Sequence, residues 1–288
     1  MTHYFSRRSF LKGSAAAAAA LTSPLLPADA AFSETENGLF SPVSALCQTQ
    51  YGPVKGREGE NGQLCWYGIP YGAAPTGESR WTAPQEPARW LTVRDCTSPA
   101  PAAYQYTTFP LGTEDCLTLD IYSSAEAKKR PVLVYLHGSA ATGSSLELPG
   151  SELVRDAGCV FVALNYRLGL FGWNCLPALT ADPDAAGNFA LLDIARALDW
   201  VRDNIASFGG DPQNLTVLGF AAGGRDGMAL LASPLFVGRF QKAISISGGM
   251  TCADENTSAE TLAAALAPLA VQDGKALTEA AARRWLLT

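Results

Sequence analysis

The sequence has 288 residues, of which 48% are hydrophobic, and a formal net charge of −6 at neutral pH. This length and apolar content suit one large α/β domain or two small ones, and they exclude an intrinsically disordered chain. The acidic balance argues against nucleic acid and against anionic membrane surfaces as partners.

The first thirty residues have the pattern of an export signal. Arg7 and Arg8 precede a short Ala-rich apolar stretch, and Ala28-Asp29-Ala30 resembles a cleavage site. Paired arginines in this arrangement indicate the twin-arginine route, so the export machinery is an expected partner. We therefore assign 1–30 to the signal and 31–288 to the mature domain, and we expect a periplasmic or secreted protein. Cleavage removes three basic residues and one acidic residue, which changes the net charge from −6 to −8.

The seven cysteines all follow the signal, where an oxidising compartment makes disulfides plausible. Because seven is odd, at least one thiol lacks an internal partner. The sequence has two histidines, His3 and His137, and no closely spaced cysteine pair. We expect no metal site, and no nucleotide or haem motif is visible, so no cofactor is expected.

The order of elements indicates an α/β fold. Residues 41–71 resemble a small antiparallel region with turns near Gly52 and Gly62. Beyond it, short apolar runs alternate with amphipathic segments, which favours a mostly parallel central sheet with flanking helices. The expected strands are 117–124, 131–138, 159–166, 215–220 and 242–248, and the expected helices are 187–207, 222–232, 257–269 and 277–287.

One glycine-rich turn has the layout of a nucleophile elbow. Gly219-Phe220-Ala221-Ala222-Gly223 lies between an expected strand and an expected helix, as in the G-x-S-x-G motif. The middle position, which holds the nucleophile in that motif, is Ala221. The turn is either a degenerate catalytic elbow or a chance glycine-rich turn.

The longer stretch FGGDPQNLTVLGFAAG (208–223) resembles the elbow signature of type-B carboxylesterases, a family that includes para-nitrobenzyl esterases and cholinesterases. EDCLTLDIY (114–122) matches a second signature of that family. GIPYGAAPTGESRW (68–81) and LNYRLGLFGW (164–173) are similar to further segments in the same order. The resemblance implies an α/β-hydrolase fold, fades after Gly249, and predicts that the C-terminal part of the fold is missing.

The resemblance also assigns site residues. Ala221 takes the nucleophile position, Gly219 and Gly223 are the elbow glycines, and the oxyanion donors are the N–H groups of Ser139, Ala140 and Ala222. Ser139 departs from the family glycine, so we expect strain or a reshaped loop. In the family, the residue at Cys116 pairs with a cysteine whose position here is Tyr104, and Cys252 pairs with one further on.

Acyl transfer by this mechanism needs a hydroxyl nucleophile, an imidazole and a carboxylate. Ala221 offers no nucleophilic atom, and no histidine follows the elbow, where the fold places its base. His137 is expected to hold a loop, and Asp226 to lie on a helix surface. Phe220 either lines a ligand pocket or packs in the core. Ser245 and Ser247 are expected in the segment after the elbow helix, and Trp66, Trp81 and Trp90 are expected to pack over the sheet.

Whether the chain is an enzyme therefore stays open. The first hypothesis is an exported carboxylesterase homologue that does not hydrolyse esters and binds a small ester-like ligand or a protein partner. The alternative is an active carboxylesterase for short esters, altered or incomplete in this chain. A third hypothesis is a decayed product that folds poorly. If residue 288 ends the fold, strand 242–248 becomes an open edge. We then expect the helices that follow to cover it, with Leu262, Leu266 and Leu269 inward, and the protein to self-associate there.

Overall fold

The computed structural model describes residues 44–59, 62–148, 150–176, 179, 187–249 and 252–272. The export signal, the turn at residues 60–61 and the expected helix 277–287 lie outside these residues. Among the described residues no helix is long and apolar enough to cross a membrane.

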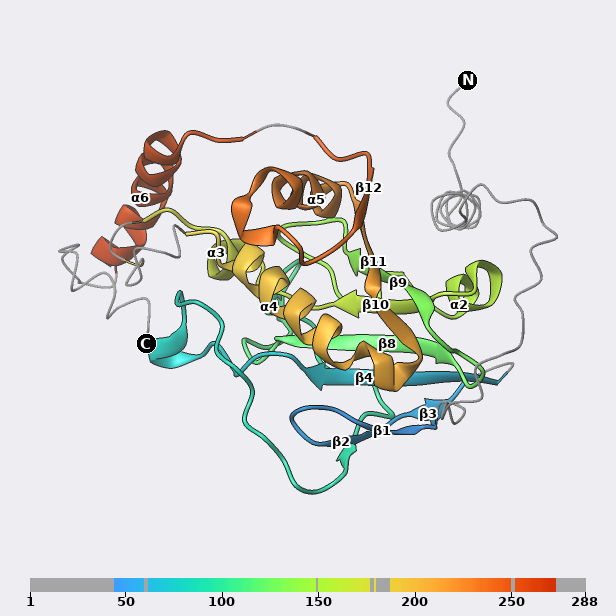
Figure 1. The fold of residues 1–288 in the computed structure, drawn as a ribbon. Helices are drawn as coiled ribbons and strands as arrows, with labels where there is room; N and C mark the ends of the chain where they lie inside the picture. The colour runs from blue at the N-terminus through green and yellow to red at the C-terminus, as the bar shows by residue number, and fades with distance from the viewer. Residues whose placement is uncertain are drawn as a thin grey trace.

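A seven-stranded sheet organises the molecule, in the order β12-β11-β9-β10-β8-β4-β3 (Figure 1). Strands β9, β10, β11 and β12 run parallel to their neighbours in this group, whereas β10–β8, β8–β4 and β4–β3 are antiparallel. The sheet is therefore mixed, and its parallel half carries the elbow. The strands are β3 (Arg57–Glu58), β4 (Gln63–Pro70), β8 (Thr118–Ser124), β9 (Arg130–Leu136), β10 (Val160–Leu164), β11 (Gly210–Phe220) and β12 (Lys242–Ile246).

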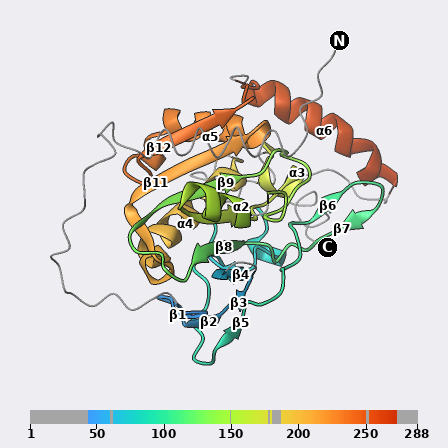
Figure 2. The same cartoon turned by 90° about the vertical axis from the view of Figure 1, so that its right-hand side faces the viewer.

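The expected N-terminal antiparallel region is present. β1 (Leu46–Gln48) pairs antiparallel with β2 (Pro53–Lys55), and β2 pairs parallel with β5 (Arg94–Asp95). β4 belongs to the large sheet, where it pairs with β3 and β8 and is buried on both faces. A separate hairpin, β6 (Gln105–Tyr106) with β7 (Pro110–Leu111), projects beside the main body (Figure 2).

Helices cover both faces of the sheet. Alternate residues of β9 and β10 point to opposite faces, and both strands are buried on both, as expected for strands with continuous apolar runs. One face packs against α4 (Phe189–Asn204) and α5 (Ala222–Ala232), and the other against α2 (Ser151–Ala157). The remaining helical segments are η2 (Gly77–Ser79), α3 (Gly169–Gly172), η3 (Ile205–Phe208), η4 (Pro234–Phe236) and α6 (Glu255–Gln272).

The amphipathic pattern of 187–207 correctly predicted α4. Ile194, Leu198 and Val201 are fully buried in the core, and the helix ends through a 3₁₀ turn at Gly209, whose φ is 82°. Trp66 and Trp81 are buried and Trp90 packs half-buried against the core, so all three serve packing, as expected.

The expected position of α6 was wrong. Its Leu262 and Leu266 do face inward, but they pack against a cluster of Trp81, Leu176, Leu179 and Phe189 instead of β12. Figure 1 shows α6 beside α3 and away from β12. The Leu269 side chain lies outside the described ones. β12 is half-buried, and no described strand pairs with its outer edge.

Candidate active site

The elbow is a sharp turn between β11 and α5. Ala221 has φ 48° and ψ −109°, a conformation that side chains with a Cβ rarely adopt. Such strain costs of order 1–3 kcal/mol and persists only when its surroundings enforce it. Here the Ala221 N–H donates to the Ile246 carbonyl at 2.8 Å, and the Arg225 N–H donates to the Ala221 carbonyl at 3.0 Å. The sequence thus folds into the elbow that the motif predicts.

Both elbow glycines are required by close backbone approach. A Cβ at Gly219 would lie 2.0 Å from the carbonyl oxygen of Gly223. A Cβ at Gly223 would lie 2.3 Å from the carbonyl oxygen of Leu136, at the end of β9. Either contact is too short for a real side chain, so these positions let α5 pack directly on the strand ends.

The side chain presented by this turn is a methyl group. The elbow motif places its nucleophilic atom at the Ala221 side chain, and this side chain carries no oxygen, nitrogen or sulfur. Phe220, beside it, is half-buried and packs against the core on the α2 face. It therefore contributes to core packing.

The loop after β9 carries the residues expected to bind an oxyanion. The Ala222 N–H donates to the Gly138 carbonyl at 3.3 Å, so this donor already has a partner. The Ser139 hydroxyl accepts the N–H groups of Ala141 and Thr142 at 3.2 and 3.1 Å. Ser139 is not among the described residues with positive φ. Its side chain therefore reshapes the loop into a local turn without backbone strain.

His137 lies buried beneath this loop. Its ring stacks on Tyr166 with centroids 4.3 Å apart and planes 3° apart, and Nδ1 lies 3.4 Å from the Tyr166 hydroxyl. Burial lowers the pKa of His137 to about 4, so the imidazole is neutral at neutral pH. The Gly143 backbone crosses the ring so closely that a Cβ there would lie 2.6 Å from Nδ1. These contacts support the loop-holding interpretation.

Asp226 corrects an expectation. Sequence reasoning placed it on the helix surface, but it is 3% exposed, and its Oδ2 has no hydrogen-bond partner among the described residues. Burial raises the pKa of Asp226 to about 7, and the charge of Arg225 opposes that shift. One turn past the elbow, α5 packs against both β11 and β12, and this encloses the side chain.

Ser245 and Ser247 lie where they were expected, after the elbow helix. The Ser245 hydroxyl, on β12, donates to the Gly224 carbonyl at 2.9 Å. Ser247 follows β12 with φ 56°. The Ser245 hydroxyl thus links β12 to the start of α5 by a hydrogen bond.

A buried polar network supports the loop from below, and the sequence analysis missed it. Asp120 on β8 accepts the Gly68 N–H at 2.8 Å and the Ser145 hydroxyl at 2.6 Å. Asn165 accepts the Ser145 N–H at 2.8 Å and donates to the hydroxyl of Thr118 at 3.2 Å. Burial raises the pKa of Asp120 to about 6, and the hydrogen bonds that it accepts from Ser145 and Gly68 oppose that shift. Polar residues inside apolar strand runs were the available signal.

A second buried contact ties α4 to the segment after β10. Arg167 donates from Nη2 and Nε to the two carboxylate oxygens of Asp193 at 2.7 and 2.9 Å, and both side chains are almost fully buried. Burying two charges is tolerated when such geometry satisfies both groups. Nothing in the sequence alone joined these two residues.

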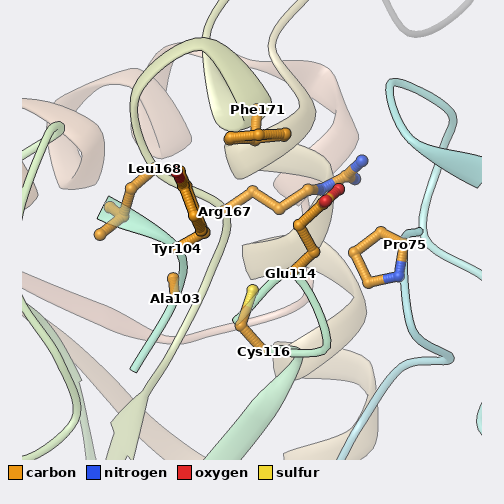
Figure 3. Close-up of a pocket in the computed structure, with 8 residues that line it drawn as sticks. All are labelled: Pro75, Ala103, Tyr104, Glu114, Cys116, Arg167, Leu168 and Phe171. Atoms are coloured by element: carbon orange, nitrogen blue, oxygen red, sulfur yellow. The ribbon is translucent and has the colours of Figure 1, made fainter. Parts of the chain in front are cut away.

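Arg167 also lines a small cavity of about 10 Å³, enough for roughly one water molecule. Tyr104, Glu114, Cys116 and Phe171 line it as well (Figure 3). Tyr104 packs edge-on against Phe171, with centroids 5.4 Å apart. Cys116 and the other six cysteines are free thiols in this structure.

The described residues contain no group of three or more His, Cys, Asp or Glu side chains that could hold a metal ion. The site therefore consists of a strained strand–turn–helix elbow, a facing loop, and the buried network beneath that loop.

This arrangement agrees with comparisons to known proteins. The carboxylesterase family model matches residues 43–276. The chain is 42% identical over 242 residues to the para-nitrobenzyl esterase of Bacillus subtilis, covering 80% of this chain and 49% of that protein. It is 35% identical over 254 residues to the fumonisin B1 esterase of Sphingopyxis macrogoltabida, covering 82% of this chain and 46% of that protein.

Solved structures of esterases have the same fold as this chain. A PNB esterase structure superposes with a TM-score of 0.75 at 40% identity, covering 83% of this chain and 50% of that one. A thermophilic PNB esterase superposes with a TM-score of 0.74 at 39% identity, covering 83% of this chain and 50% of that one. The fold is thus that of an α/β-hydrolase. The chain belongs to the carboxylesterase family, and it spans about half the length of these relatives.

The N-terminal expectation is also confirmed. A twin-arginine translocation signal matches residues 5–24, so the protein is directed across the membrane, to the periplasm or out of the cell.

Proposed function

We propose that this chain is an exported carboxylesterase-family scaffold that does not hydrolyse esters. The observation that carries the proposal is Ala221, which occupies the strained elbow position with a methyl group. Hydrolysis through an acyl-enzyme needs a nucleophilic atom at this point, and its activation needs a base within hydrogen-bond reach. A retained elbow without that atom suits binding better than turnover.

The surroundings of Ala221 support the same conclusion. The Ala222 N–H, an expected oxyanion donor, is bonded to the Gly138 carbonyl. His137 is buried, stacked on Tyr166 and neutral at neutral pH, so it is poorly placed to exchange protons with a ligand. An oxyanion hole accelerates acyl transfer when its donors are free to meet the developing charge.

The proposed ligand is a small ester-like molecule or a protein partner. The net charge of −8 that follows removal of residues 1–30 disfavours nucleic acid and anionic membranes as partners. The outer edge of β12, which no described strand covers, is the proposed site of self-association. Each backbone hydrogen bond gained there contributes about 0.5–1.5 kcal/mol. Light scattering over a concentration series should show association, and a strictly monomeric protein would contradict this part of the proposal.

The second candidate function is ester hydrolysis by a Ser-His-acid mechanism on short carboxylic esters, in a protein of which this chain is an altered or incomplete form. The observation that favours it is the intact elbow geometry, including both close glycine contacts. The relatives named as esterases are about twice as long as the matched region.

Kinetics with para-nitrophenyl acetate and butyrate separate the two candidates. We expect the exported protein to show no saturable turnover and no covalent adduct with a fluorophosphonate, as read by intact mass. Ala221→Ser should gain far less than the ~10⁶ that a complete triad contributes, because a serine without its base is a weak nucleophile. Ala222→Ser, one residue away, is the matched control.

Saturable turnover by the unmodified chain, abolished by the fluorophosphonate, would overturn the non-hydrolytic proposal. Activity of Ala221→Ser within about tenfold of the Bacillus subtilis relative, with the control inactive, would instead show that a base is present and favour the second candidate.

A further inference from the structure

The seven cysteines fall into two groups that differ in access. Cys47, Cys65, Cys96, Cys116 and Cys159 are buried, whereas Cys175 is half-exposed and Cys252 is exposed. Burial raises the pKa of Cys47 and of Cys159 to about 12. Because the thiolate is the species that attacks a disulfide, buried thiols of this kind are unreactive. Only the accessible pair can meet an oxidant at an appreciable rate.

The segment that carries Cys175 packs against α6, the helix that begins three residues after Cys252. Leu262 and Leu266 of α6 lie against a cluster that includes Leu176, the residue next to Cys175. Figure 1 shows α6 beside α3. Cys252 lies just before the first residue of α6, Glu255. Cys175 thus lies next to a residue that α6 contacts, and Cys252, 77 positions further along the sequence, lies three residues before that helix.

The first residue of α6, Glu255, acts on Cys175 electrostatically. The negative charge of Glu255 acts on the Cys175 thiol and, after burial, is a further cause of its raised pKa. Cys252 precedes Glu255 by three residues, and an extended chain spans at most about 3.6 Å per residue. The Cα atoms of Cys252 and Glu255 therefore lie within about 11 Å of each other. A disulfide needs Cα atoms about 4.4–6.8 Å apart. Formation of a Cys175–Cys252 disulfide therefore requires the short exposed segment 252–254 to change its backbone conformation.

We propose that Cys175 and Cys252 form a disulfide after export, which fastens α6 to the segment following α3. The oxidant is a small-molecule or protein disulfide of the oxidising compartment. The exposed Cys252 thiolate attacks one sulfur of that disulfide, forms a mixed disulfide and releases one thiol. The Cys175 thiolate then attacks the Cys252 sulfur and releases the second thiol. Two protein thiols lose two electrons and two protons, and the oxidant disulfide is reduced to two thiols.

The structure explains the order of these steps. Cys252 has the freer access, while burial and the carboxylate of Glu255 hold the Cys175 pKa up and reduce its thiolate fraction. Cys175 is therefore the resolving thiol, and the step it performs should set the rate of closure.

The proposal is tested on the exported protein, titrated from reduced to oxidised glutathione. In the oxidised protein, five of the seven thiols should react under denaturing conditions, and peptide mapping should join Cys175 to Cys252. Cys175→Ser and Cys252→Ser should each keep one glutathione-reactive thiol and form no internal bond. Glu255→Gln should close faster than the unmodified protein at neutral pH, because removal of the carboxylate lowers the Cys175 pKa.

Three results would overturn the proposal. They are a protein that carries glutathione on both cysteines without closing, a dimer linked through Cys252, and an internal bond that involves one of the five buried thiols. A rate of closure unchanged in Glu255→Gln would overturn the assignment of Cys175 as the resolving thiol.

Discussion

Replacing Asp226 with asparagine should stabilise the protein at alkaline pH and leave it unchanged in acid. The buried carboxyl has a pKa of about 7 in the fold, compared with 3.8 for an unperturbed aspartate. The folded state therefore prefers the protonated acid. Stability from this group is fully present below about pH 4 and is lost as the pH rises through about 7.

The size of the effect follows from the shift. About three pKa units correspond to roughly 4 kcal/mol of differential interaction, since each unit is worth 1.36 kcal/mol. The side chain is 3% exposed and Oδ2 lacks a partner, so little solvent screening reduces this figure. Because asparagine cannot ionise but still buries a polar group, we expect a net gain of about 2–4 kcal/mol at pH 8.

Urea unfolding at pH 4, 6 and 8 measures this gain. The difference between Asp226→Asn and the unmodified protein should grow from near zero at pH 4 to its full value at pH 8. Glu260→Gln, which removes an exposed carboxylate, should show no such pH trend. An Asp226→Asn difference that is constant across the three pH values would refute the reasoning, because it would mean that Asp226 is ionised in the fold.

Three further predictions concern packing. Asp193→Asn should lower the free energy of unfolding by about 3–5 kcal/mol, because it leaves the buried Arg167 charge without its counter-charge; a loss below 1 kcal/mol in urea unfolding would contradict the buried ion pair. Tyr104→Cys should allow an oxidised bond to Cys116 across the small cavity that both residues line; mass mapping that finds both thiols free after oxidation would argue against that proximity. Gly223→Ala should cost about 1–3 kcal/mol or shift α5, since its Cβ would meet the Leu136 carbonyl; an unchanged melting temperature would refute the close contact.

The sequence by itself determined the main strands and helices of the parallel half of the sheet and their order along the chain, but not α2, α3 or the β6–β7 hairpin. The helix expected at 222–232 is α5 with the same limits, and the strand expected at 215–220 is the end of β11. The elbow at Ala221 was also recoverable, because its conformation is set by a strand, a turn and a helix that are contiguous in the sequence. Local pattern and spacing are sufficient for features of this kind.

Contacts between distant segments were decided only by the tertiary structure. The sequence predicted Asp226 to be a surface residue, but α5 packs against both β11 and β12, and this packing buries Asp226. The apolar face of α6 was recognised, but the sequence does not say which of several apolar surfaces that face covers. In the structure α6 packs against the Trp81 cluster and not against β12. The ties from Asp120 to Gly68 and Ser145 cross 52 and 25 residues. Burial and pairing over such separations depend on where whole elements dock, and periodicity along one element carries no information about that.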